Sequence, residues 1–191
     1  LVPTDKRYTR RNLRSTLKYN SDKCKLLREV ELIIIDEISM VRSDIIDFID
    51  KVLRVYNRNM REPFGGKQLL LVGDIYQLEP VLKEEDRQLL QPYYASSYFF
   101  DAKVFQDYPL VSIELNKVYR QSDPSFISIL DHIRTNQVSE KEIRYINTRV
   151  GTQIEKAEET FTITLSTRRD TVDWINNQGL ESLKGDPVTF L

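Results

Sequence analysis

The fold class is decided by the stretch LIIIDEISM, Leu32 to Met40. Its first four residues are a continuous apolar run rich in β-branched side chains, which is typical of a strand buried on both faces of a parallel sheet. The run ends abruptly in two acids, Asp36 and Glu37. We therefore expect a short strand over residues 31–35 that presents two carboxylates at its carboxyl end.

A helix is expected directly after this strand. From Ser43, a suitable N-cap, apolar residues recur at helical spacing to Tyr56, and charged residues fill the opposite face. Pro63 and the pair Gly65-Gly66 break the pattern before a second apolar run at residues 68–72. Two apolar strands around an amphipathic helix predict a βαβ unit in a parallel sheet covered by helices, which is an α/β fold.

Further elements are expected downstream of this unit. They are short helices and turns over 84–108, strands over 110–115 and 161–165, and helices over 122–135, 139–149 and 171–183. The helix at 122–135 has a clear start, because Asp123 is an N-cap candidate and Pro124 fits the first helical position. The sheet pattern restarts around Asn116, where we expect a domain boundary.

Composition excludes several classes of protein. The 191 residues are 40% hydrophobic and 30% charged, and the apolar runs reach four residues, whereas a membrane-spanning helix needs about 20. The N-terminus has no secretory signal pattern. A single cysteine, Cys24, and a single histidine, His132, exclude an internal disulfide and the usual Cys/His zinc sites. We expect an intracellular protein without a membrane partner, in the cytoplasm or nucleoid of a bacterium or in the nucleus or mitochondrion of a eukaryote.

The net charge of −1 hides a basic N-terminal segment. Residues 1–30 carry a net charge of +6 and the remainder carries −7. A cluster that includes Arg10, Arg11 and Arg14 is suited to binding nucleic-acid phosphates. A solvated basic segment without a partner explains the charge equally well.

Polar side chains that follow the two strands predict the site. In open α/β sheets, ligands bind outside the carboxyl ends of parallel strands. Asp36 and Glu37 follow the first strand in the Walker B pattern, in which the aspartate holds Mg²⁺ through water and the glutamate polarises the attacking water. Gln77 follows the second strand and can sense a γ-phosphate, because neighbouring strands end about 5 Å apart. Taken singly, each residue also fits a surface turn.

Three segments together resemble one enzyme family. They are LIIIDEISM (residues 32–40), PFGGKQLLLVGDIYQLEPV (63–81) and IELNKVYRQSDPSF (113–126). These runs resemble motifs II, III and IV of superfamily-one DNA helicases of the petite-integration-frequency type, which are relatives of RecD. The Pro-Phe-Gly-Gly approach to the GD..QL motif is characteristic of that type, and the resemblance covers most of residues 31–183.

The resemblance implies two tandem RecA-like domains of the P-loop NTPase fold that clamp ATP and step 5′ to 3′ along single-stranded DNA. Residues 1–115 would belong to the first domain and 116–191 would begin the second. The implied function is an ATP-dependent DNA helicase that uses ATP and Mg²⁺ and acts on single-stranded DNA and duplex junctions. In it, Asp36 is the Mg²⁺ acid, Glu37 the catalytic acid and Gln77 the γ-phosphate sensor.

The second domain is expected to contribute two further site residues. By the same resemblance, Arg120 in Val-Tyr-Arg-Gln is an arginine finger and Tyr119 lies against the adenine. A guanidinium that reaches the phosphates only in the closed cleft couples hydrolysis to domain closure. The alternative for Arg120 is a surface salt bridge to Asp123.

Contacts with DNA are expected from two more regions. Pro80 and Val81 lie in a loop that is near the DNA path in the family, but Glu79 stands where the family has a proline, and a carboxylate beside phosphates is unfavourable. Arg168, near the place of a family asparagine, is able to contact phosphate or to begin a solvated helix.

The sequence contains no G-x-x-x-x-G-K-[ST] phosphate loop. Gly65-Gly66-Lys67 precedes a strand, whereas a phosphate loop follows a strand and opens a helix. In the family this loop lies upstream of the Walker B strand, so we expect it before Leu1. Because position 1 is not Met, we expect the chain to be a piece of a longer protein and to be inactive alone.

Two other functions fit parts of the pattern. One is a non-catalytic nucleic-acid or protein-binding domain that has lost its phosphate loop. The other is a metal-dependent nuclease with Asp36, Glu37 and Asp74 as a carboxylate cluster. The sequence indicates neither an oligomeric state nor a preferred DNA substrate.

Overall fold

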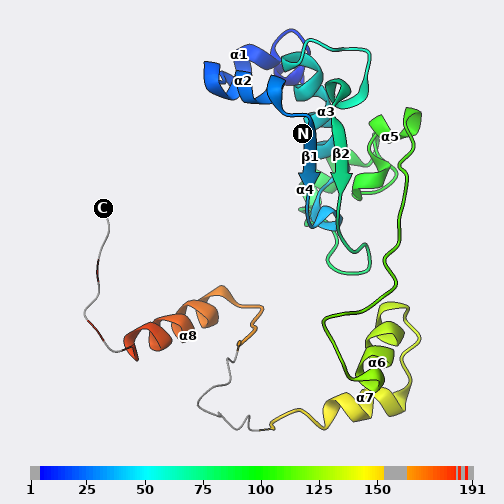
Figure 1. Ribbon diagram of the computed structural model, residues 1–191, viewed down its shortest axis with the longest axis vertical. Helices are drawn as coiled ribbons and strands as arrows, with labels where there is room; N and C mark the ends of the chain where they lie inside the picture. The colour runs from blue at the N-terminus through cyan, green and yellow to red at the C-terminus, as the bar shows by residue number, and fades with distance from the viewer. Residues whose placement is uncertain (1–4, 153–162, 184, 186–187, 189–191) are drawn as a thin grey trace. The chain divides into compact units, whose positions relative to one another are not determined.

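The structure is a computed structural model that describes residues 5–152, 163–183, 185 and 188 (Figure 1). The chain forms two compact units, Leu1–Ser139 and Glu140–Leu191. The segment 116–139 therefore groups with the first unit in this structure. The expected boundary between motor domains at residues 115 and 116 stays a prediction.

A βαβ unit forms the centre of the first unit. Strand β1 (Leu32–Ile35) and strand β2 (Gln68–Leu71) pair in parallel with Ile35 opposite Leu71, and α3 (Ser43–Tyr56) connects them. This confirms the unit expected from the alternation of apolar runs and helical period. Ser43 is the first residue of α3 rather than its N-cap, a position that Arg42 occupies.

The two faces of the β1–β2 sheet differ in burial. Ile33, Ile35, Leu69 and Leu71 pack against a core that includes Ile46 and Leu53 of α3. On the other face, Ile34 is 59% exposed and Leu70 is 47% exposed. Burial on both faces, as expected for a run without polar residues, is therefore wrong for the part of the chain that the structure describes, because no described helix covers this second face.

The N-terminal segment packs on the other side of α3. It contains a 3₁₀ turn (Lys6–Tyr8) and helices α1 (Leu13–Leu17) and α2 (Ser21–Glu29). Leu13 is fully buried and forms a cluster with Val52, Val55 and Tyr56 of α3. Helix α3 thus packs against both the sheet and the basic N-terminal segment.

The Pro-Phe-Gly-Gly turn (Pro63–Gly66) fastens the end of α3 to the start of β2. Phe64 is buried, and its N–H donates to Asp50 Oδ1 at 2.6 Å. Gly65 has φ +67°, and a Cβ there would lie 2.8 Å from the carbonyl oxygen of Leu53. Only glycine allows the backbone to approach α3 this closely with this φ.

The remaining helices follow the sequence pattern. They are α4 (Glu84–Leu90), α5 (Val104–Asp107), α6 (Pro124–Arg134), α7 (Glu140–Asn147) and α8 (Arg169–Glu181), with 3₁₀ turns at Ile38–Met40 and Phe99–Asp101. Asp123 caps α6 by accepting from the N–H groups of Ser125 and Phe126, as expected. Across the described helices, none combines the length and apolar character that crossing a membrane requires.

Two expected strands differ from the structure. The expected strand at 110–115 is wrong: the segment has no regular structure, and Val111, Ile113 and Leu115 are more than four-fifths exposed. A strand requires a neighbour for its backbone hydrogen bonds, and this segment pairs with neither β1 nor β2. Of the strand expected at 161–165, residues 161–162 lie outside the described part and 163–165 have no regular structure.

Candidate active site

The carboxyl ends of β1 and β2 form one edge with a shared set of polar residues. The parallel register carries both strands to this edge together, and the N–H of Ile38 donates to the carbonyl oxygen of Val72 at 3.0 Å. Asp36 and Glu37 follow β1, whereas Asp74 and Gln77 follow β2. Asp36, Glu37 and Gln77 therefore follow the ends of two paired strands, and their roles in a shared site stay predictions.

The turn after β1 exposes both acids. Glu37 has φ +51°, a left-handed conformation that is uncommon for a residue with a side chain and that recurs at functional sites. Asp36 Oδ1 accepts from the N–H of Glu37 at 2.9 Å, and both residues are exposed. Within the described residues neither carboxylate has an ion-pair partner, so the oxygens are open to a hard cation such as Mg²⁺, which keeps most of its waters.

The three-carboxylate cluster of the nuclease alternative is not present. Among the described residues, no three His, Cys, Asp or Glu side chains lie close enough to hold a metal ion together. Asp74 is instead committed to its own turn. The set that remains, one aspartate and one glutamate at a strand end, fits a cation held jointly with a phosphate rather than by the protein alone.

Gly73 lets the two strand ends approach each other. A Cβ at this position would lie 2.9 Å from the nitrogen of Ile38. Beneath this contact, Ser39 is fully buried, and its Oγ has no hydrogen-bond partner among the residues that the structure describes. Sequence reasoning missed Ser39, because a serine in a short turn has no signal that distinguishes a buried hydroxyl from a solvated one.

Asp74 organises the turn that carries Gln77. Its carbonyl oxygen accepts from the N–H of Gln77 at 3.1 Å, and its Oδ1 accepts from the N–H of Tyr76 at 3.0 Å. Its Oδ2 accepts from Gln77 Nε2 at 3.3 Å. The side-chain amide of Gln77 is therefore oriented by Asp74 within the turn itself.

Arg134, at the end of α6, also contacts this turn. Its Nη2 lies 3.4 Å from Asp74 Oδ1, and its guanidinium carbon lies 4.9 Å from the centre of the Tyr76 ring. Sequence reasoning missed Arg134 because an arginine in the last turn of a helix is common and belongs to none of the quoted motifs.

Arg120 and Tyr119 lie in an exposed segment without regular structure. Tyr119 is 81% exposed, and the ammonium of Lys117 lies 4.7 Å from the centre of its ring. Arg120 makes no ion pair in the described part of the chain, and Asp123 is engaged in capping α6. The structure does not bring Arg120 or Tyr119 into contact with Asp36, and their roles stay predictions.

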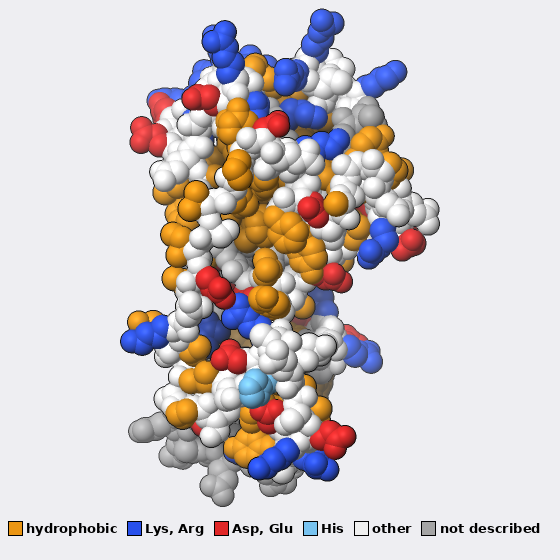
Figure 2. Space-filling model, turned by 90° about the vertical axis from the view of Figure 1, so that its right-hand side faces the viewer, with side chains coloured by type: hydrophobic (Ala, Val, Ile, Leu, Met, Phe, Trp, Pro, Cys, Tyr) orange, Lys and Arg blue, Asp and Glu red, His pale blue; other side chains and the backbone are white. Residues whose placement is uncertain are grey.

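The arginines of the basic segment have different surroundings. Arg14 donates to the carbonyl oxygen of Val55 at 2.8 Å and lies over the ring of Tyr56, so its guanidinium joins α1 to α3. Arg11 is exposed, and Arg10 lines a pocket. Figure 2 shows that Lys and Arg side chains gather at the end of the first unit where Figure 1 draws α1 and α2.

The other DNA-contact candidates also differ in exposure. Pro80 is buried, whereas Val81 is 81% exposed. Arg168 is exposed and pairs with Asp170 in the second unit. A buried Pro80 presents no surface to a DNA strand, so among these three residues only Val81 and Arg168 are accessible.

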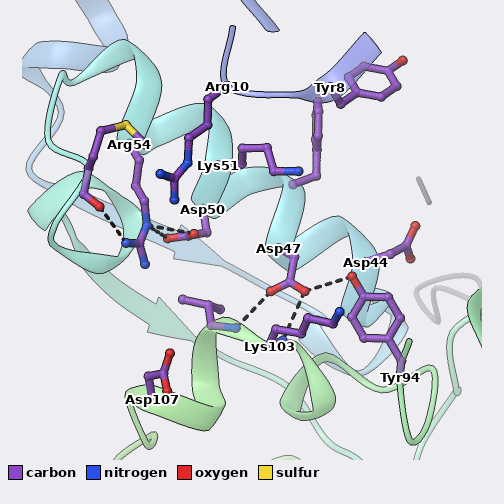
Figure 3. A pocket seen from close by; sticks show the side chains of 13 residues that line it. Tyr8, Arg10, Asp44, Asp47, Asp50, Lys51, Arg54, Tyr94, Lys103 and Asp107 are labelled. Atoms are coloured by element: carbon purple, nitrogen blue, oxygen red, sulfur yellow. Dashed lines mark hydrogen bonds and ion pairs between the residues drawn. The ribbon is translucent and has the colours of Figure 1, made fainter. Parts of the chain in front are cut away.

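A pocket of about 340 Å³ lies beside α3 rather than at the strand ends (Figure 3). Of the predicted site residues, it contains only Arg10. Asp47 is occupied by structural hydrogen bonds from the Tyr94 hydroxyl at 2.9 Å and from the N–H groups of Lys103 and Val104 at 3.1 and 3.0 Å. Burial, and then the charge of Asp47, raise the pKa of Tyr94. On this face of α3, Asp47 is therefore hydrogen-bonded to the segment that contains Tyr94, Lys103 and Val104.

An ion pair anchors the turn that follows the β1 acids. Arg42 donates to both carboxylate oxygens of Asp44 at 2.8 Å and to Asp86 of α4 at 2.9 Å. Asp44 is 2% exposed. Burial pushes the pKa of Asp44 upward, but hydrogen bonds from the Arg42 guanidinium and the attraction of its charge hold it below the usual value.

Known proteins match this chain over most of its length. The family model described as PIF1-like helicase matches residues 4–144. The ATP-dependent DNA helicase PIF1 of Rattus norvegicus is 33% identical over 158 residues, which are 83% of this chain and 23% of that protein. This chain thus spans less than a quarter of that relative's length.

Solved structures match it as well. The Pif1 helicase from Bacteroides, in complex with ADP-AlF3 and ssDNA, superposes with a TM-score of 0.78 at 38% identity over 88% of this chain and 39% of that one. A structure that describes DNA unwinding at forked dsDNA by two coordinating Pif1 helicases gives 0.74 at 40% identity, over 85% of this chain and 38% of that one.

These comparisons test the fold class and the family resemblance. The α/β, RecA-like fold class expected from the sequence is confirmed by the solved relatives. The resemblance seen in motifs II, III and IV is confirmed by the family model, which covers all three. This chain belongs to the PIF1-like helicase family.

Proposed function

We propose that this chain is part of an ATP-dependent 5′ to 3′ DNA helicase. The observation that carries the proposal is the common edge of β1 and β2, where Asp36, Glu37 and Gln77 follow adjacent parallel strands. Residues 1–115 belong to the first motor domain in this proposal, and residues 116–191 begin the second. The phosphate loop is supplied by a part of the protein that this sequence does not include.

At this edge each residue has a distinct task. When bound, ATP with Mg²⁺ supplies a phosphoryl group whose transfer to water releases the energy for movement. Asp36, with its exposed carboxylate, would hold the cation. Glu37 orients the attacking water and accepts a proton from it, and its left-handed backbone places the carboxylate outside the line of the strand. Gln77 donates its amide N–H to the γ-phosphate.

Arg120 and Tyr119 complete the cleft in the closed state. Arg120 has no ion-pair partner in the described residues, so its guanidinium is available for a phosphate oxygen. Tyr119, with most of its ring exposed, supplies a surface for the adenine. Their position in a segment without regular structure supports the proposal that they reach the nucleotide only when the cleft closes.

Single-stranded DNA and duplex junctions are the proposed partners. The relatives named above include a helicase solved with ssDNA and one described at forked dsDNA. Arg10 and Arg11 on the basic segment, Val81 after the Gln77 turn and Arg168 are the proposed contacts from this chain. Such a substrate places the protein in the compartment that holds DNA.

Replacing Glu37 in the full-length protein tests the proposal. Glu37→Gln keeps the shape of the side chain but cannot accept the proton, so DNA-stimulated ATP hydrolysis is expected to fall by about 100-fold or more. The matched control is Glu85→Gln on α4, an exposed glutamate outside the three quoted motifs, which is expected to keep the wild-type rate. Wild-type hydrolysis by the Glu37 variant would contradict the proposal.

A further inference from the structure

Arg134 makes two contacts with the turn that carries Gln77. Its Nη2 lies 3.4 Å from Asp74 Oδ1, and its guanidinium lies over the Tyr76 ring. A single exposed ion pair contributes little. An ion pair combined with a cation–π contact on the same turn fixes both the direction and the plane of the guanidinium, which a lysine could not reproduce.

Asp74 links Arg134 to Gln77 through its two carboxylate oxygens. Its Oδ1 is shared by Arg134 and the N–H of Tyr76, and its Oδ2 accepts from Gln77 Nε2 at 3.3 Å. Both carboxylate oxygens are therefore engaged, and the plane of the carboxylate sets the direction of the Gln77 amide. Without Arg134, this carboxylate, which is 27% exposed, loses the partner that holds Oδ1 from outside the turn.

We propose that Arg134 is a positioning residue that fixes the Gln77 amide through Asp74. The inference rests on the proposed function, in which Gln77 senses the γ-phosphate. Helix α6, which carries Arg134 in its last turn, follows the segment of Arg120 along the chain.

The test is steady-state ATP hydrolysis by the full-length protein with saturating single-stranded DNA. Arg134→Ala is expected to lower kcat by about 3- to 30-fold, the usual range for a residue that acts through coupling. KM for ATP and the melting temperature are expected to stay at wild-type values. Arg134→Lys, which keeps the charge near Asp74, is expected to recover part of the lost kcat.

A double-mutant cycle with Gln77→Ala separates positioning from a general loss of structure. If Arg134 acts through Gln77, adding Arg134→Ala to Gln77→Ala lowers kcat no further. The matched control is Arg87→Ala, which removes an exposed ion pair with Glu84 on α4 and is expected to leave kcat unchanged.

Two results would overturn the inference. One is a wild-type kcat for Arg134→Ala, and the other is losses that multiply in the double variant. Either result leaves the proposed function standing, because the wild-type protein still hydrolyses ATP. An inactive wild-type protein with intact sequence upstream would instead overturn the proposed function itself.

Discussion

Buried polar side chains decide much of the local geometry in this chain. Ser43 and Asp44 are buried beside Ser39, but their partners are clear: Ser43 Oγ donates to the carbonyl oxygen of Ser96, and Asp44 pairs with Arg42. Buried charges that have lost water are stabilised only by such partners. The turn after the β1 acids therefore depends on the ion pair between Arg42 and Asp44 and on the second ion pair that Arg42 forms with Asp86.

The Arg42–Asp44 pair makes stability depend on acid pH. Because the folded state lowers the pKa of Asp44 below its unfolded value, the stabilising contribution is present above about pH 4 and is lost as pH falls through the folded pKa. Asp44→Asn is expected to lower the free energy of unfolding at pH 7 by about 3 kcal/mol, because Arg42 loses its buried partner. The variant is also expected to lose less stability than the wild type on acidification. Urea unfolding at pH 7 and pH 3.5 measures both effects.

Asp86→Asn is the control for this prediction. Asp86 contacts the same guanidinium, but its side chain is 42% exposed, so its removal is expected to cost less than about 1 kcal/mol. Equal losses for the two variants would contradict the assignment of the stability to the buried member of the pair.

At the scale of elements, the sequence predicts those helices and strands whose formation depends on residues near one another in the chain. The βαβ unit and the boundaries of α6 could be predicted, because periodicity, Asp123 and Pro124 are local signals. The strand expected at 110–115 is wrong, because an apolar pattern does not show whether a neighbouring strand is present to pair with it. The contacts of Asp47 on α3 could not be predicted for the same reason, because Asp47 accepts from the N–H groups of Lys103 and Val104, far along the chain.

The candidate site likewise contains residues that local sequence signals predict and a contact that they do not. Asp36, Glu37 and Gln77 follow strands, and a parallel sheet brings its strand ends to one edge, so their placement after the paired strands could be predicted. The contact of Arg134 with Asp74 depends on the packing of α6, for which the sequence has no periodic or motif signal.

The Pro-Phe-Gly-Gly turn leads to a prediction about Gly65. Gly65→Ala introduces a Cβ 2.8 Å from the Leu53 carbonyl oxygen at a positive φ, so the free energy of unfolding is expected to fall by about 1–3 kcal/mol. Chemical denaturation followed by far-UV circular dichroism measures this loss of stability. Gly179→Ala, within α8 and with open space around the new Cβ, is expected to raise helix stability by about 0.5–1 kcal/mol. A neutral Gly65→Ala would show that the turn does not constrain β2.

At the scale of the whole molecule, one face of the β1–β2 sheet exposes apolar side chains to water. Leu32, Ile34, Leu70 and Val72 are all at least two-fifths exposed on or directly after the two strands. Contiguous apolar surface of this kind promotes association in water. We expect another part of the proposed whole helicase to cover this face.

The exposed face predicts opposite effects in two forms of the protein. Ile34→Thr combined with Leu70→Thr is expected to reduce self-association of the 191-residue chain in light scattering. In the full-length protein the same substitutions are expected to lower the free energy of unfolding, because each threonine replaces a buried apolar side chain, at about 1–3 kcal/mol per site. Unchanged stability of the full-length variant would show that the face stays exposed there.

Ser39 has one more consequence. Its hydroxyl has already lost its water, and the cost of that dehydration is part of the folded state. A hydrogen-bond partner that reaches Ser39 Oγ from another part of the protein therefore gains the full interaction without a further dehydration cost at the hydroxyl. The turn beneath the β1 acids therefore presents a dehydrated hydroxyl to which a further polar group can bind.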